Sequence, residues 1–213
     1  MLYKVLRAIL KIFIKPIMRV HVNGLENLPE NNDYILCSNH SSNWDPIFLA
    51  ISLPNQIYFM AKKEILEWPI IGRVIKKIGV FAVDRDGRDM ASLKYSIKLL
   101  KEGKTLGIFP EGTRVKSIDR ENMKDGVAFI ALKAKADVVP VEIISTFKPF
   151  RKTFVNIHQP IKVDKFLDMK TRVAMEKMTD EIFDGIYTSY FDQIEGSNNA
   201  NNYSWKFWIL LWC

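Results

Sequence analysis

The sequence predicts a single α/β domain with a mostly parallel or mixed sheet that is covered by helices on both faces. Short apolar runs rich in β-branched and aromatic residues alternate with longer segments of helical spacing, a pattern typical of such sheets. The chain has 213 residues, enough for one sizeable domain, and no Gly/Ser/Pro-rich linker divides its middle. We therefore expect one domain over residues 20–195, an N-terminal helix over 1–19 and a tail over 196–213.

The first element is an amphipathic helix over residues 2–19. On a helical wheel its cations fall within an arc of about 120° and apolar residues cover the rest; the cations are Lys4, Arg7, Lys11, Lys15 and Arg19. A transmembrane helix would need about 20 mostly apolar residues, and no small-residue cleavage site follows an apolar core of adequate length. We expect the helix to lie in a membrane surface; the alternative is that its wide apolar side packs onto the domain.

Strands and helices then alternate along the chain. Runs of strand character are predicted at residues 20–22, 33–38, 57–61, 80–83, 105–109, 138–144 and 153–157. Helical spacing predicts helices at residues 46–53, 68–77, 90–101, 126–135 and 171–194. Gly103 directly follows the helix over 90–101 and fits the position after a helix C-cap.

Composition restricts the kinds of site. The two cysteines, Cys37 and Cys213, provide no disulfide framework and fit a reducing cytosolic setting. The three histidines are too scattered for a zinc site, so we expect no metal centre, although an oxygen-only magnesium site stays open. The net charge of +7 fits nucleic acid or an anionic membrane, and the basic arc of the first helix favours the membrane over nucleic acid.

A histidine and an aspartate stand five residues apart in Asn39–Pro46, at a predicted strand-to-helix junction. On a continuous helix they would point about 140° apart, so a turn must lie between them. Pro46 suits the first helical position, which places Asp45 at the helix start and His40 on the loop. The carboxylate can then accept the imidazole Nδ1–H and leave Nε2 as a general base. The alternative is a capped loop with an incidental histidine.

The segment Phe109–Arg114 follows the predicted buried strand over 105–109. Ligands of α/β sheets bind beyond the carboxyl ends of the strands, which makes this loop a candidate binding loop. Pro-x-Gly is also an ordinary turn signal, so the segment alone does not decide between the two interpretations.

Together these segments resemble the membrane glycerolipid acyltransferase family, whose members carry a His-x4-Asp block followed by a Phe-Pro-Glu-Gly-Thr-Arg block. Gly79–Arg85 resembles the second block of that family, with Arg85 as the informative residue, and Val139–Val141 resembles the fourth. The similarity covers roughly residues 20–165 and is nearest to short bacterial 1-acylglycerol-3-phosphate acyltransferases. Val115 departs from the pattern, because the family often has serine there.

The resemblance implies an enzyme that moves a fatty acyl group from acyl-CoA or acyl carrier protein to the sn-2 hydroxyl of 1-acylglycerol 3-phosphate, giving phosphatidic acid. It implies no cofactor and a place at the cytoplasmic face of the cell membrane. His40 and Asp45 would form the general-base pair. The substrate-binding set would be Arg85, Glu111, Gly112, Thr113 and Arg114, with the two arginines on the acceptor phosphate and Glu111 holding an arginine or an acceptor hydroxyl.

Other functions remain open at this point. The acceptor could be another lysolipid or glycerol 3-phosphate, and a protein of the same fold could bind lipid without catalysis. A lipase or thioesterase is disfavoured because the sequence has no Gly-x-Ser-x-Gly elbow. The tail ends in a tryptophan-rich segment at residues 205–213, which is too short to span a bilayer and suits either a membrane interface or an artefact of the reading frame.

Overall fold

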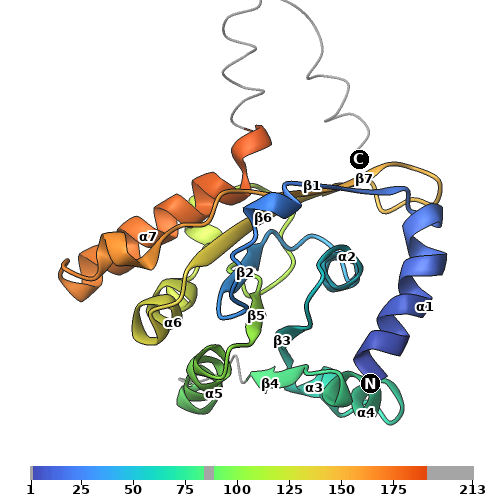
Figure 1. Cartoon of the computed structure of the whole chain (residues 1–213), viewed down its shortest axis with the longest axis horizontal. Helices are drawn as coiled ribbons and strands as arrows, with labels where there is room; N and C mark the ends of the chain where they lie inside the picture. The colour runs from blue at the N-terminus through green and yellow to red at the C-terminus, as the bar shows by residue number, and fades with distance from the viewer. Residues whose placement is uncertain (1, 84–88, 191–213) are drawn as a thin grey trace, which may run out of the picture.

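The computed structural model describes residues 2–83 and 89–190, and within them seven strands form one sheet (Figure 1). The strands are β1 (Val20–Asn23), β2 (Ile35–Ser38), β3 (Ile57–Lys62), β4 (Phe81–Val83), β5 (Thr105–Ile108), β6 (Val138–Ser145) and β7 (Thr153–Ile157). Their order is β1-β7-β6-β2-β5-β3-β4. Neighbours run parallel except β6 and β7, which are antiparallel. The predicted mixed α/β sheet is confirmed.

Helices cover both faces of this sheet. They are α1 (Leu2–Ile17), α2 (Asp45–Ser52), α3 (Lys63–Leu66), α4 (Ile71–Lys77), α5 (Met90–Lys101), α6 (Gly126–Ala134) and α7 (Thr171–Ile186). Figure 1 shows α1 and α2 on one side of the sheet and α5, α6 and α7 on the other. The sequence predicted one helix at 68–77, whereas the structure has α4 there and the additional short helix α3 before it.

The central strand β2 is buried on both faces. Ile35 and Cys37 belong to the core beneath α5, α6 and α7, while Leu36 belongs to the core beneath α2. A strand buried on both faces needs a continuous apolar run rather than alternation, which is the pattern of Ile35-Leu36-Cys37. Strand β2 therefore provides a rigid base for the loop that begins at Asn39.

Helix α1 packs one narrow stripe onto the domain and exposes a second. Tyr3 is buried, and its hydroxyl donates to the carbonyl oxygen of Asn55 at 3.3 Å, while Leu10 and Ile14 contact the core. The exposed row consists of Leu2, Val5, Ile9, Ile12, Phe13 and Ile17. Packing of part of the helix onto the domain, the alternative interpretation, is thus observed, while contact of the exposed row with a membrane stays a prediction.

Arg7 corrects the sequence prediction, because it does not belong to a lipid-facing basic arc. Its guanidinium donates to the carbonyl oxygens of Ala50 at 2.8 Å, Pro54 at 3.1 Å and Leu53, at the C-terminal end of α2. Carbonyl groups at a helix end have no partner within the helix, and an arginine is a favourable donor to them. Arg7 therefore fastens α1 to α2.

Some predictions concern residues outside the described part of the chain. Arg85 and the whole tail over 196–213 lie there, as do the last four residues of the helix predicted at 171–194. Among the helices of the described residues, none combines the length and the apolar character needed to cross a bilayer.

Candidate active site

The loop that carries His40 leaves β2 through Asn39. The side-chain amide of Asn39 donates to the carbonyl oxygen of Ile143 at 2.9 Å and accepts from the Ile143 N–H at 2.8 Å. These two bonds replace the backbone pairing that β2 would otherwise make with β6. The main chain is thereby free to turn away from the sheet at residues 40–44.

His40 and Asp45 form the predicted contact. The Nδ1 atom of His40 lies 3.0 Å from Oδ2 of Asp45, which also accepts from the backbone N–H groups of Ser41 at 2.8 Å and Ser42 at 2.7 Å. Asp45 has no exposed surface and is the first residue of α2, followed by Pro46. Donation from Nδ1–H to this carboxylate leaves the lone pair of the neutral imidazole on Nε2, which is the form that a general base needs.

The residue that directly follows strand β5, Phe109, supports the imidazole through aromatic stacking. The His40 ring stacks on Phe109 with ring centroids 4.2 Å apart, and Phe109 stacks on Phe59 at 6.0 Å. Gly107 makes room for this arrangement, because a Cβ atom there would lie 2.5 Å from a ring carbon of Phe59. The stack restricts the imidazole through its ring face, whereas Asp45 contacts it at Nδ1.

Glu111 lies beneath the His40 loop. Its side chain is 3% exposed, and Oε1 accepts from the backbone N–H of His40 at 3.2 Å and from the hydroxyl of Tyr187 at 3.1 Å. Burial raises the pKa of Glu111 to about 7, while hydrogen-bond donors, including the His40 N–H and Tyr187, act in the opposite direction.

The expectation that Glu111 holds an arginine or an acceptor hydroxyl stays a prediction, since Arg85 lies outside the described residues. Within the described residues, the buried carboxyl group of Glu111 binds the main chain of His40. Tyr187 was missed by the sequence analysis, because it stands 76 residues from Glu111 at the end of a helix and belongs to no motif. Only the packing of α7 brings the two side chains together.

The loop over Gly112–Arg114 lies beside His40. The Val115 N–H donates to the carbonyl oxygen of His40 at 2.9 Å, and the Thr113 and Arg114 side chains are exposed. Gly112 has φ +69°, a left-handed backbone conformation that side chains other than that of glycine rarely adopt, so the turn favours glycine. The segments Asn39–Pro46 and Phe109–Arg114, which the sequence indicated as candidate site segments, thus lie in contact. Arg85 lies outside the described residues.

With this geometry established, comparison with known proteins identifies the family. Residues 19–144 match the family model described as Acyltransferase. The chain belongs to the acyltransferase family. The matched region contains the His40–Asp45 pair and the loop over 111–114, and it ends before Tyr187.

Individual acyltransferases are similar over much of the chain. The 1-acyl-sn-glycerol-3-phosphate acyltransferase of Bacillus subtilis is 41% identical over 140 residues, which cover 65% of this chain and 69% of that protein. The Streptococcus pneumoniae enzyme of the same name is 34% identical over 145 residues, covering 66% of this chain and 53%, about half, of the relative. The crystal structure of the 1-acyl-sn-glycerophosphate acyltransferase PlsC from Thermotoga maritima superposes with a TM-score of 0.64 at 26% identity, covering 95% of this chain and 83% of that one.

The contact between His40 and Asp45 predicts the behaviour of Asp45→Asn. The amide can still accept from Ser41 and Ser42, but its NH2 group would favour the wrong tautomer of His40, and it cannot stabilise an imidazolium. We expect acyl transfer to fall roughly 10²- to 10⁴-fold, the usual range for loss of general-base help. Steady-state kcat and the thermal unfolding temperature are the measurements. Activity within about threefold of wild type would contradict the assigned role of the pair.

Proposed function

We propose that this acyltransferase moves a fatty acyl group from an acyl thioester to the sn-2 hydroxyl of 1-acylglycerol 3-phosphate and so forms phosphatidic acid. The observation that carries the proposal is the contact of His40 Nδ1 with the buried Asp45 carboxylate in a chain of the acyltransferase family. Two relatives, at 41% and 34% identity, bear the name of this activity. A protein that only binds lipid would not need a general base.

The chemistry requires one base and no enzyme nucleophile. Nε2 of His40 takes the proton of the acceptor hydroxyl as its oxygen attacks the thioester carbonyl carbon, and Asp45 stabilises the imidazolium. The tetrahedral intermediate then collapses, the carbon–sulfur bond breaks, and the departing thiolate takes the proton from Nε2. Cys37 does not serve as a nucleophile in this scheme, because it is fully buried and burial raises the pKa of its thiol.

Arg114 is the proposed ligand of the acceptor phosphate. It is exposed, and the bond between Val115 N–H and the His40 carbonyl keeps this stretch of loop beside the base. A guanidinium can bind a phosphate through two parallel hydrogen bonds, which would fix the acceptor relative to His40. We assign Arg85 to the same phosphate from its sequence block.

The donor, acyl-CoA or acyl carrier protein, is a substrate, and we propose that the reaction needs no cofactor or metal.

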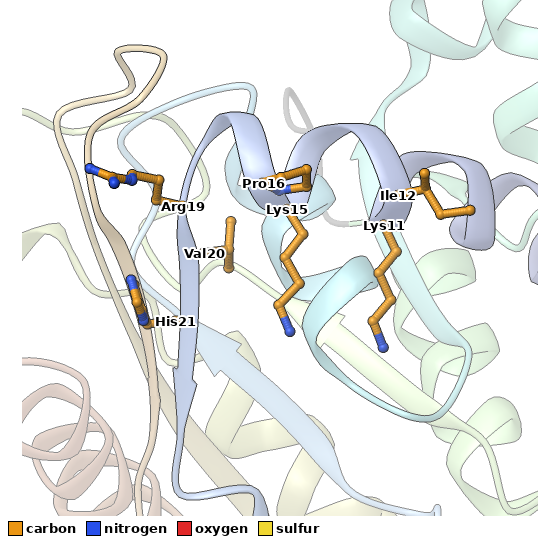
Figure 2. Close-up of a pocket in the computed structure, with 7 residues that line it drawn as sticks. All are labelled: Lys11, Ile12, Lys15, Pro16, Arg19, Val20 and His21. Atoms are coloured by element: carbon orange, nitrogen blue, oxygen red, sulfur yellow. The ribbon is translucent and has the colours of Figure 1, made fainter.

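Helix α1 is the proposed attachment to the membrane. Ile12 and Phe13 are 68% and 61% exposed, which is a large apolar area for a surface helix. Figure 2 shows Lys11 and Lys15 side by side and pointing to the same side of the helix, along an open groove of about 620 Å3. An exposed apolar row next to a row of ammonium groups matches an anionic lipid surface. We place the enzyme on the cytoplasmic face, where soluble thioester donors meet the lipid acceptor.

An acceptor panel tests the reaction itself. The enzyme is offered 1-acylglycerol 3-phosphate, a zwitterionic lysolipid or glycerol 3-phosphate, each with acyl-CoA and with acyl carrier protein. We expect the highest kcat/KM for 1-acylglycerol 3-phosphate, and His40→Ala should abolish nearly all of it. His21→Gln, a histidine on β1, is the matched control and should retain activity. Preference for another acceptor would replace the proposed substrate, and no transfer to any acceptor would refute the reaction.

The phosphate assignment predicts how Arg114 variants respond. Arg114→Ala should raise the KM for the acceptor at least tenfold while changing the KM for the donor little, because the lost contact is with the acceptor phosphate. Arg114→Lys should recover only part of this effect, because an ammonium does not form the paired hydrogen bonds. Arg172→Ala on α7 is the control, since that residue is an exposed arginine on another element. A change confined to the donor KM would move Arg114 to the donor site.

The attachment is tested by reversing charge on α1 without touching Arg7. Lys4, Lys11 and Lys15 are changed together to Glu, and binding to vesicles containing phosphatidylglycerol is measured by co-sedimentation. Each basic residue contributes on the order of 1 kcal/mol near an anionic surface, so the triple variant should be released, and added salt should weaken wild-type binding. The same reversal at Lys94, Lys133 and Lys177, one on each of α5, α6 and α7, is the control. Unchanged binding of the α1 variant would exclude this helix as an electrostatic anchor.

A further inference from the structure

Tyr187 connects the last helix to the loop that carries His40. Its ring is 6% exposed, and its hydroxyl donates to Oε1 of Glu111 at 3.1 Å. The same oxygen accepts from the backbone N–H of His40 at 3.2 Å. One carboxylate oxygen thus joins three segments that follow β2, β5 and α7.

The packing of α7 holds this tyrosine in place. Met178, Ile182 and Ile186 are buried in the core that includes Ile35 and Cys37. Gly185 lies against Pro140 of β6 so closely that a Cβ atom would come within 2.7 Å of the proline ring. Helix α7 therefore sits firmly against the sheet, and the turn after it points the Tyr187 hydroxyl at Glu111.

The charge of Glu111 depends on its donors. Burial raises its pKa to about 7, and the negative charge of Asp45 also raises it, whereas donation from the His40 N–H and from Tyr187 lowers it. Two further titratable groups of the described residues face this site: Cys37 of β2 interacts with Glu111, and Glu142 of β6 interacts with Tyr187. Burial raises the pKa of the Tyr187 phenol far above its usual value, so it remains a neutral donor.

Protonation of Glu111 would weaken its hold on the loop. Oε2 is buried and has no hydrogen-bond partner in the described part of the chain, which makes it the oxygen that would take a proton. A neutral carboxyl group is a weaker acceptor than a carboxylate, so the His40 N–H would lose its charged partner. The backbone of His40 would then be less firmly fixed relative to Asp45 and the acceptor.

We propose that Tyr187 is a positioning residue for acyl transfer, which keeps Glu111 as the carboxylate that holds the main chain of His40. The proposal rests on the proposed function of His40. It assigns a role in the reaction to a side chain beyond the matched family region, which ends at residue 144. Tyr187 acts through Glu111 and touches neither substrate.

The hydrogen-bond donors of Glu111 determine the direction in which the pH profile of kcat shifts. Removing the Tyr187 hydroxyl removes a contact that lowers the pKa of Glu111, so this pKa rises further in Tyr187→Phe. Glu111 is active as the carboxylate, and activity is lost as the pH falls through its pKa. The acidic limb of the kcat profile therefore moves to higher pH in the variant.

The kinetic test compares Tyr187→Phe with Tyr95→Phe, which changes a 43% exposed tyrosine on α5 in the same way. At pH 7 the Tyr187 variant should lose about tenfold in kcat, the size expected for one hydrogen bond to a charged group, with KM for both substrates within twofold. Most of this loss should be recovered at pH 9. In a Glu111→Gln background, Tyr187→Phe should change kcat less than twofold. Tyr95→Phe should match wild type throughout.

A second measurement, the NMR titration of the Glu111 carboxyl group, does not depend on acyl transfer. In protein labelled with 13C at glutamate side chains, the Glu111 carboxyl signal is identified by its absence in Glu111→Gln. It should titrate near pH 7 in wild type and at higher pH in Tyr187→Phe. An unchanged titration of Glu111 in Tyr187→Phe would overturn the proposal, even if the enzyme uses another acceptor. Three other results for this variant would also overturn it: a kcat loss that is equal at all pH values, a change in KM alone, or a lower unfolding temperature with kcat unchanged.

Discussion

A carboxylate that has no contact with water is stable as an ion only if hydrogen-bond donors or cations replace the lost hydration, and the site is organised around this requirement. One oxygen of Asp45 receives the Ser41 and Ser42 N–H groups and faces the His40 imidazole. These contacts require the chain to fold tightly between residues 40 and 45. The turn determines where the imidazole of His40 lies, and helix α2 starts from it.

A second buried carboxyl group, that of Glu111, binds the same loop at the backbone of His40. Glu111 accepts from the His40 main chain, and Val115 donates to the His40 carbonyl, so both polar groups of the His40 backbone bind the loop after β5. The imidazole itself contacts Asp45 at Nδ1 and stacks on the Phe109 ring. His40, the proposed base, is therefore held through its side chain by one pair of contacts and through its backbone by another. Such preorganisation favours a reaction that needs one fixed geometry.

Helix α1 binds the domain with one side and exposes apolar residues on another. Arg7 and Tyr3 bind the segment over 50–55 at the end of α2, and α2 begins at Asp45. The exposed apolar row lies elsewhere on the same helix. The element proposed to meet the membrane is thus in direct contact with the helix that begins at Asp45, a member of the proposed catalytic pair. Through α2, the proposed membrane contact is thus linked to the loop that carries His40.

The sequence by itself determined the mixed α/β fold, the extent of most strands and helices, and the contact of His40 with Asp45. These features depend on local patterns: the period of apolar residues, the turn before Pro46, and two side chains five residues apart. Only the tertiary structure decided that Glu111 holds the His40 backbone, that Tyr187 reaches Glu111, and that Arg7 binds the end of α2. Periodicity reveals which side of an element is buried, but the partner of a buried polar group depends on strand order and helix packing, which bring together residues 71 and 76 positions apart.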